Sequence, residues 1–195
     1  QAQMNPHFVF NVLTAIQNAI LKNEIDNAIS YLADVSRLIR RTLDYASEKY
    51  ISLEDEIEYL ENYLRLEKIR MKSRLKTSIE IDSKLDPQTA VIPPMLLQPL
   101  IENAIKHGLN KDQNTVNVLV RFEKISDTKY QCVVEDNGPG ISPKSTSTHI
   151  SRGLDMIYTR IQLLNEEFGE EAFAFIVSNK VNPETGARMV VEMRI

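Results

Sequence analysis

Apolar residues in positions 1–45 recur with the three- and four-residue spacing of an α-helix. In the first stretch they are Val9, Val12, Leu13, Ile16 and Ile20. In the second they form two adjoining stripes, Ile29, Leu32, Ile39 and Leu43 on one and Ala28, Val35 and Leu38 on the other. The polar residues 22–26 between the two stretches have the length of the connection in an antiparallel helical hairpin. Because one hairpin cannot cover both stripes, we expect a dimeric four-helix bundle.

A third helical pattern begins after residue 52. Ser52 stands three residues before Asp55, the spacing of a helix N-cap. Leu53, Ile57, Leu60 and Leu64 follow along one face of this predicted helix. Its many Glu and Lys residues indicate a solvent-exposed face with pairs one turn apart, such as Glu61 and Arg65. A partner-binding role for that face is the less favoured alternative.

The pattern changes near residue 75, where alternation of apolar and polar residues becomes common. Residues 75–82, 115–125 and 129–136 are predicted strands, and the helix over 93–108 is closed by Gly108. A further helix over 154–168 precedes a final hairpin, whose strands 172–178 and 187–195 are joined by 179–186. The fold class is therefore α+β. We expect two domains, a helical one over 1–72 and an α+β one over 73–195.

Composition narrows the setting of the protein. The 195 residues carry a net charge of -4 without a long basic run, which argues against nucleic-acid binding. Cys132 is the single cysteine, so an internal disulfide is excluded and a reducing cytoplasm is expected. No apolar run approaches the roughly 20 residues that cross a bilayer. Because the chain starts at Gln, we expect a soluble piece of a longer protein, whose upstream membrane or sensor region would not be visible here.

The stretch "VVEDNGPGI" ends an apolar strand in a carboxylate followed by two glycines. Asp136 is thereby placed at the end of the predicted sheet, and Gly138 and Gly140 allow a sharp turn and close approach of a ligand to the backbone. A nucleotide pocket has these requirements. The same residues are also typical of an ordinary turn, so this stretch alone does not decide between a nucleotide pocket and a turn.

The stretch "LIENAIKHG" carries a group of polar residues on one side of a predicted helix. Asn103, Lys106 and His107 are spaced at i, i+3 and i+4, so they share a face. An amide oxygen is a suitable ligand for Mg²⁺, and a lysine can meet phosphate charge. The alternative is a solvated helix end at which His107 complements the helix dipole.

Together these segments resemble a known ATP-binding fold. The helix with Asn103, the D-N-G-P-G turn, a polar loop and "RGLDMIYTRIQLL" are similar, in this order, to the N, G1 and G2 boxes of GHKL proteins. With "NPHFVFN", "LENYLRLEKIRM" and "IPPMLLQPLIENAIKHG", they resemble the LytS-like family of sensor histidine kinases. The resemblance covers essentially the whole chain.

The resemblance implies a dimerising phosphoacceptor bundle followed by a Bergerat (GHKL) α/β sandwich with a mixed sheet, which binds ATP and Mg²⁺. It implies that Asp136 accepts a hydrogen bond from the adenine amino group and that Asn103 binds Mg²⁺. It also places residues 142–152 over the nucleotide, with Lys144 and Arg152 as phosphate contacts. The implied nucleotide-binding residues are Asn103, Lys106, His107, Asp136, Gly138, Gly140, Arg152, Gly153 and Leu154.

One segment departs from the family pattern. Where family members carry G-x-G-L-x-N, this chain has Ser151 in place of the first glycine and Met156 in place of the asparagine. A side chain at 151 removes the conformational freedom of glycine, and Met156 cannot hydrogen-bond as asparagine does. We therefore expect reduced ATP affinity or turnover, with the adenine and magnesium contacts still possible.

His7 lies near the N-terminus, directly after a proline that suits the first position of a helix. As an isolated residue it could be a packing residue, a metal ligand or a nucleophile. The resemblance implies that His7 is the phosphoacceptor, since a neutral imidazole nitrogen can attack phosphorus. Phe8 stands where many histidine kinases have a carboxylate, so the base is unassigned. Asn11, one helical turn after His7, could orient the imidazole or a water.

We therefore expect a sensor histidine kinase fragment of a two-component system. ATP would phosphorylate His7, and the phosphoryl group would pass to an aspartate of a response-regulator receiver domain. The expected assembly is a homodimer. The alternative is a nucleotide-binding dimeric signalling module with weak or no kinase activity, which the altered 151–156 segment favours. A GHKL ATPase of the chaperone or topoisomerase kind is disfavoured, because Glu102 adjoins Asn103 instead of preceding it by a turn.

Overall fold

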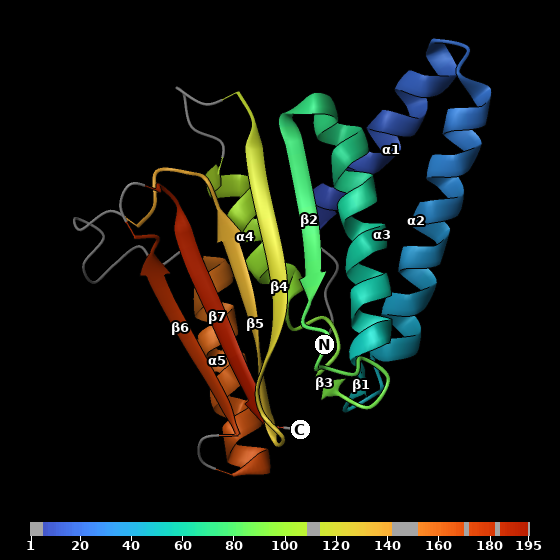
Figure 1. The fold of residues 1–195 in the computed structure, drawn as a ribbon. Coiled ribbons are helices and arrows are strands. Elements are labelled where there is room, and N and C mark those ends of the chain that lie inside the picture. The colour runs from blue at the N-terminus through green and yellow to red at the C-terminus, as the bar shows by residue number, and fades with distance from the viewer. Residues whose placement is uncertain (1–5, 109–113, 142–151, 170–171, 182–183, 195) are drawn as a thin grey trace. The chain divides into compact units, whose positions relative to one another are not determined.

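The computed structural model describes residues 6–108, 114–141, 152–169, 172–181 and 184–194. The chain divides into two compact units (Figure 1). The first comprises Gln1–Ser73 with Val91–Met95, and the second comprises Arg74–Ala90 with Leu96–Ile195. None of the helices in the described part of the chain has the length and apolar character needed to cross a membrane.

The first unit is built from three helices and a short antiparallel strand pair. Its elements are α1 (Pro6–Leu21), α2 (Ile25–Tyr45), β1 (Ile51–Ser52), α3 (Leu53–Met71) and β3 (Val91–Ile92). The predicted cap of the third helix is confirmed, because the Ser52 hydroxyl accepts a hydrogen bond from the Asp55 backbone nitrogen at 3.0 Å. The two-residue strands β1 and β3 pair with each other and were not predicted.

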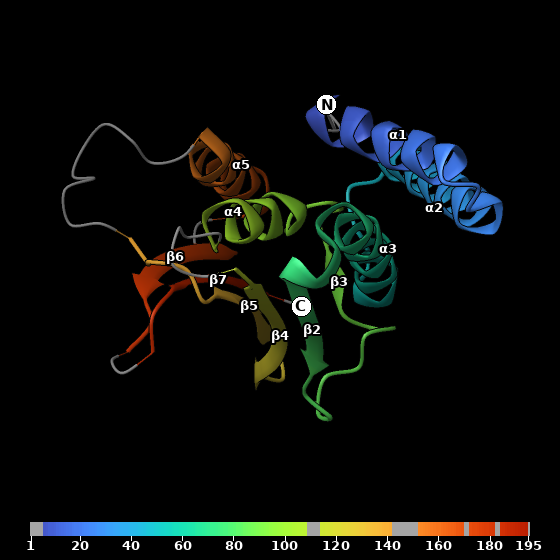
Figure 2. The ribbon, with the colours of Figure 1, turned by 90° about the horizontal axis from the view of Figure 1, so that it is seen from above.

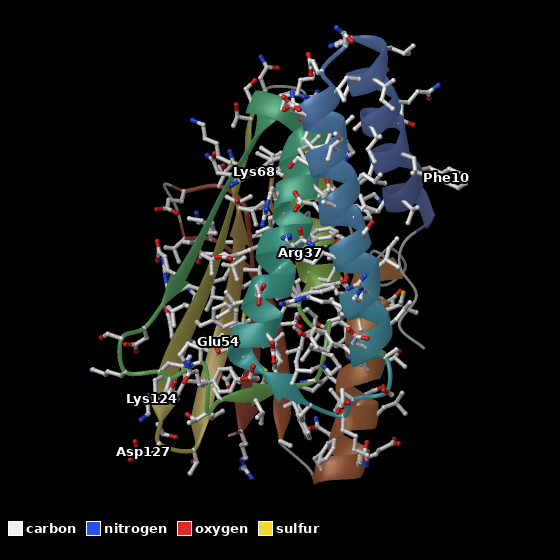
Figure 3. The ribbon with its side chains drawn as sticks, turned by 90° about the vertical axis from the view of Figure 1, so that its right-hand side faces the viewer. Phe10, Arg37, Glu54, Lys68, Lys124 and Asp127 are labelled. Carbon is white, nitrogen blue, oxygen red and sulfur yellow. The ribbon has the colours of Figure 1, made fainter. Side chains whose placement is uncertain are left out.

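The two apolar stripes of α2 have different environments. Ala28, Val35 and Leu38 are buried, whereas Ile29, Leu32, Ile39 and Leu43 are exposed. On α1 the buried residues Phe8, Val12 and Ala19 likewise contrast with exposed Phe10, Leu13 and Ile20. Phe10 is 69% exposed, and Figure 3 shows its side chain projecting away from the hairpin. The prediction that one hairpin leaves a second apolar stripe uncovered is therefore confirmed, while the dimer itself stays a prediction.

The predicted solvent-exposed face of α3 is confirmed, since Glu54, Glu58, Glu61, Arg65 and Lys68 are exposed, but two details differ. Glu56 is fully buried, and its carboxylate accepts a hydrogen bond from the Met95 backbone nitrogen at 2.9 Å. Arg65 forms an ion pair with Asp34 of α2 at 3.2 Å, in place of the expected pair with Glu61. Tertiary contacts thus involve charged side chains that the sequence spacing predicted to face only solvent or their own helix.

The second unit contains a five-stranded mixed sheet in the order β2-β4-β5-β7-β6. Its strands are β2 (Leu75–Ile81), β4 (Val116–Ser126), β5 (Lys129–Asp136), β6 (Phe173–Asn179) and β7 (Ala187–Arg194). β2 and β4 are parallel, and the other neighbouring pairs are antiparallel. The short 3₁₀ helix η1 (Lys72–Arg74) leads into β2.

Helices α4 (Gln98–Gly108) and α5 (Arg152–Phe168) lie side by side over one face of this sheet (Figure 2). Val120, Val134 and Val191 are buried beneath them and alternate with residues of the other face. That other face carries cross-strand ion pairs such as Arg121 with Glu80 at 2.9 Å. The predicted α+β class and mixed sheet are confirmed, and residues at the helix-covered face near the end of β5 form the candidate site.

Candidate nucleotide-binding site

Asp136 is the last residue of β5 and is buried, with 4% of its surface exposed. Its Oδ1 accepts hydrogen bonds from the backbone nitrogens of Gly138 at 2.8 Å and Ala187 at 3.3 Å. Burial raises the pKa of the carboxyl, and these two backbone donors, His107 and Lys180 act in the opposite direction. Both described hydrogen bonds use Oδ1, so Oδ2 is the oxygen that can accept from a ligand.

The turn after Asp136 packs tightly against the end of α4. A Cβ atom added to Gly138 would lie 2.7 Å from the carbonyl oxygen of His107 and 2.9 Å from the Cα atom of Gly108. Gly140 has a φ of +76°, a conformation that favours glycine. The glycines identified in the sequence are therefore needed for close approach at one position and for backbone conformation at the other.

Asn103 lies one helical turn before the end of α4 and is half-buried. Its Nδ2 donates to the sulfur of Met189 on β7 at 3.7 Å. Met189 is paired with Val134, which points to the same side of the sheet as Asp136 because it is two residues earlier on β5. The structure thus brings Asn103 and Asp136 to the same, helix-covered side of the sheet.

Lys106 and His107 are exposed in the last turn of α4. Partial desolvation of the imidazole, followed by the neighbouring Lys106 charge, lowers the pKa of His107, and the Asp136 carboxylate opposes this effect. A lowered pKa favours the neutral ring at neutral pH. The charges of His107 and Asp136 therefore interact, and Lys106 adds an exposed positive charge at the end of α4.

The remaining predicted residues are only partly described. Arg152, Gly153 and Leu154 are the first residues of α5. The side chain of Arg152 is not among the parts that the structure describes, and neither are residues 142–151, which include Lys144. His7 and Asn11 lie on α1 in the other unit, with the His7 side chain also outside the described set. Met156, at the position of the family asparagine, is exposed on α5.

A hollow of about 380 Å³ lies at the same end of the sheet as Asp136. Asp136 is part of its lining, together with Lys76, Ser78, Leu119 and Glu135, which register places on the face that the helices do not cover. Asn103 is not among the described residues that line it. This hollow is therefore not the space between Asp136 and Asn103. Among the described residues, no group of three or more His, Cys, Asp or Glu side chains could hold a metal ion.

Three contributors to the site were not predicted from the sequence. Ala187 donates its backbone nitrogen to Asp136, and Met189 contacts Asn103. Gly186 has a φ of +127°, and a Cβ atom added to it would lie 1.9 Å from the carbonyl oxygen of Asp136. The sequence shows a glycine just before the last predicted strand, but no local signal connects Gly186 to Asp136, which ends a strand far away in the sequence.

Comparison with known protein families places this geometry in context. Residues 1–75 match the family described as "Histidine kinase". Residues 94–192 match "Histidine kinase-, DNA gyrase B-, and HSP90-like ATPase". The sensor histidine kinase BtsS of Escherichia coli K12 is 31% identical over 98% of this chain and 32% of its own length. The sensor protein LytS of Bacillus subtilis is 33% identical over 100% of this chain and 33% of its own length.

The chain belongs to the LytS- and BtsS-like sensor histidine kinases. It spans about a third of the length of these two relatives. The histidine kinase domain of the blue-light activated kinase from Erythrobacter litoralis EL346 has the same fold, with a TM-score of 0.56. The alignment covers 97% of the present chain and 95% of that chain, with 16% sequence identity. The histidine kinase ThkA, solved in complex with the response regulator protein TrrA, aligns with a TM-score of 0.51 and 17% identity over 97% of this chain and 59% of that chain.

Proposed function

We propose that the second unit binds ATP with Mg²⁺ and that His7 accepts the γ-phosphoryl group, which then passes to an aspartate of a response-regulator receiver domain. The observation that carries the proposal is the placement of Asp136 and Asn103 on one side of the sheet, in a chain with a histidine kinase domain followed by an ATPase domain. ThkA, which has the same fold, was solved with a response regulator, and this supports a receiver domain as partner.

The residues present fit a magnesium-loaded nucleotide. The buried Asp136 carboxylate has Oδ2 available to accept a hydrogen bond from the amino group of a base. The side-chain amide of Asn103 contains a carbonyl oxygen, the kind of atom that a hard cation such as Mg²⁺ binds. Lys106 and Arg152 would meet phosphate charge, with Lys144 in the same role. The backbone at Gly138, Gly140, Gly153 and Leu154 would border the nucleotide.

In this proposal ATP supplies the phosphoryl group, and Mg²⁺ offsets the charge on its phosphates. An imidazole nitrogen of His7 attacks the γ-phosphorus, the N–P bond forms as the bond to the ADP oxygen breaks, and the ring proton leaves to solvent. Asn11 orients the ring or a water from one turn away. The protein contributes positioning and charge stabilisation, as is general for phosphoryl transfer.

The exposed stripe on the helical hairpin supports a homodimer. Its residues are spaced by three and four along each helix, the pattern that packs against another helix. They are Phe10, Leu13 and Ile20 on α1 and Ile25, Ile29, Leu32, Ile39 and Leu43 on α2. A second copy presents the same stripe, so two hairpins would bury both stripes in a four-helix bundle.

We also propose that the chain is the cytoplasmic portion of a membrane-anchored sensor.

Autophosphorylation tests the proposal directly. Incubation with γ-labelled ATP and Mg²⁺ should give an acid-labile label, as phosphohistidine does, and His7→Ala should abolish it. Asn103→Ala should also remove the label, because the metal contact is lost. Labelling of the His7→Ala variant equal to that of the wild type would overturn the proposal.

A second candidate function rests on the departures at residues 151 and 156. A dimeric module that binds nucleotide and signals through conformation, with weak or no kinase activity, would need no effective phosphate contacts at this segment. Met156 is exposed and offers no hydrogen bond at the position of the family asparagine. Mg-ATP binding without phosphohistidine, in a protein with its upstream region and partner present, would favour this candidate.

A further inference from the structure

Asn179, the last residue of β6, holds the end of the turn that follows Asp136. The backbone nitrogen of Ile141 donates to Asn179 Oδ1 at 2.5 Å, and Asn179 Nδ2 donates to the carbonyl oxygen of Ile141 at 3.1 Å. A single side-chain amide thus satisfies both backbone groups of one residue, as a neighbouring strand would. This two-point contact is the attachment of Ile141 to the β6–β7 hairpin.

The same contact determines what fits at Gly140. A Cβ atom added there would lie 2.6 Å from Asn179 Oδ1 and 3.3 Å from the carbonyl oxygen of Gly186. Any side chain at this position would displace the Asn179 amide, in addition to the strain from the positive φ. Gly140 and Asn179 therefore fit each other as a pair.

The hairpin also contacts the beginning of the turn. Gly186 packs against the carbonyl oxygen of Asp136, and the Ala187 nitrogen donates to the Asp136 carboxylate at 3.3 Å. Lys180 donates its backbone nitrogen to the carbonyl oxygen of Gly186 at 3.0 Å, which joins the two sides of the hairpin beside these contacts. One hairpin thus holds residues 136–141 at both ends.

We infer that Asn179 is a positioning residue for the nucleotide site, because it holds Gly140 and Ile141 in the conformation that the turn needs beside the Asp136 carboxylate. The inference rests on the proposed function and concerns a residue outside the segments that suggested that function. Without the Asn179 amide, the glycine-containing turn would sample more conformations, and binding would have to restrict them. We expect roughly five- to thirtyfold weaker nucleotide binding, because binding would have to fix the backbone of about one additional residue.

Asn165 of α5 offers a matched control, because it contacts Phe173 at the other end of β6. Its amide makes the same two-point contact with Phe173, accepting from the backbone nitrogen at 2.8 Å and donating to the carbonyl oxygen at 2.9 Å. Asn165→Ala therefore removes the same kind of hydrogen bonds without touching residues 136–141. The two alanine variants should lower the thermal midpoint similarly, so they can be compared at a temperature where both are folded.

Two measurements on the full chain test the inference. Amide hydrogen exchange of Ile141, followed by NMR without nucleotide, should be faster in Asn179→Ala and unchanged in Asn165→Ala. Calorimetric titration with a non-hydrolysable ATP analogue and Mg²⁺ should give the roughly five- to thirtyfold loss of affinity for Asn179→Ala alone. Unchanged exchange and affinity in Asn179→Ala, or an equal loss of affinity in Asn165→Ala, would overturn the inference while the proposed function stands. A wild-type chain that binds no analogue would overturn both.

Discussion

Replacement of Asp136 by asparagine should separate nucleotide binding from stability. Asparagine keeps an Oδ1 atom that can accept from the Gly138 and Ala187 nitrogens, so the turn should be retained. At the position of Oδ2, however, it presents an NH₂ donor in place of an acceptor. That donor would face the amino group of the adenine, which is itself a donor.

The affinity change follows from the hydrogen bond that is lost. A hydrogen bond to a charged group contributes about 1.5–3 kcal/mol. This corresponds to roughly 10- to 150-fold weaker binding of an ATP analogue. The buried position of Asp136 favours the upper part of that interval, because water cannot replace the missing acceptor easily.

Stability should change in the opposite direction. Burial raises the pKa of Asp136, so the folded state binds this proton more tightly than the unfolded chain does. The wild type therefore loses stability as pH rises from the unfolded pKa through the folded pKa, and the full loss is present above the folded value. Asp136→Asn removes this loss, so its free energy of unfolding should exceed that of the wild type at neutral pH, with the difference shrinking as pH falls through the folded pKa.

Urea unfolding across a pH series and calorimetric titration provide the two readouts. Glu135→Gln is the matched control, because Glu135 is adjacent on β5 but faces the other side of the sheet and pairs with Arg188 at 3.3 Å. It should leave analogue affinity unchanged and cost at most about 1 kcal/mol. The reasoning would be refuted if the Asp136→Asn variant bound the analogue with wild-type affinity, or if Glu135→Gln lost as much affinity as Asp136→Asn.

Three further predictions concern the helical unit. Phe8 is 4% exposed and its ring stacks on Tyr63 with centroids 4.9 Å apart, so Phe8→Ala should lower the free energy of unfolding by about 3 kcal/mol in urea titrations. Exposed Phe10→Ala should change it by less than about 0.5 kcal/mol per chain, yet weaken self-association in sedimentation experiments. Ser52→Ala should cost about 1 kcal/mol, since the Asp55 nitrogen loses its cap; an unchanged urea midpoint would contradict that role.

The parts of the fold that depend on neighbouring residues were predictable from the sequence. Asp136 lies at a strand end because an apolar alternation stops there and glycines follow. The helix with Asn103 ends at Gly108, and Ser52 caps α3, as their local signals indicated. Such signals act within one or two turns of chain.

The parts that depend on tertiary register were not predictable. Asn179 and Gly186 reach the Asp136 turn only because β7 pairs with β5 and β6 pairs with β7. An asparagine at a strand end has no local feature that identifies its partner as Ile141. Glu56 is buried because a distant backbone nitrogen, that of Met95, supplies its hydrogen bond. The short strands β1 and β3 contain too few residues for alternation to be detected.

The magnesium dependence of nucleotide affinity in Asn103→Ala tests the central claim most directly. If Asn103 and Asp136 serve one pocket, the wild type should bind an ATP analogue more tightly with Mg²⁺ than with a chelator, and Asn103→Ala should bind it equally weakly in both conditions. A full magnesium-dependent gain in the Asn103→Ala variant would contradict the claim.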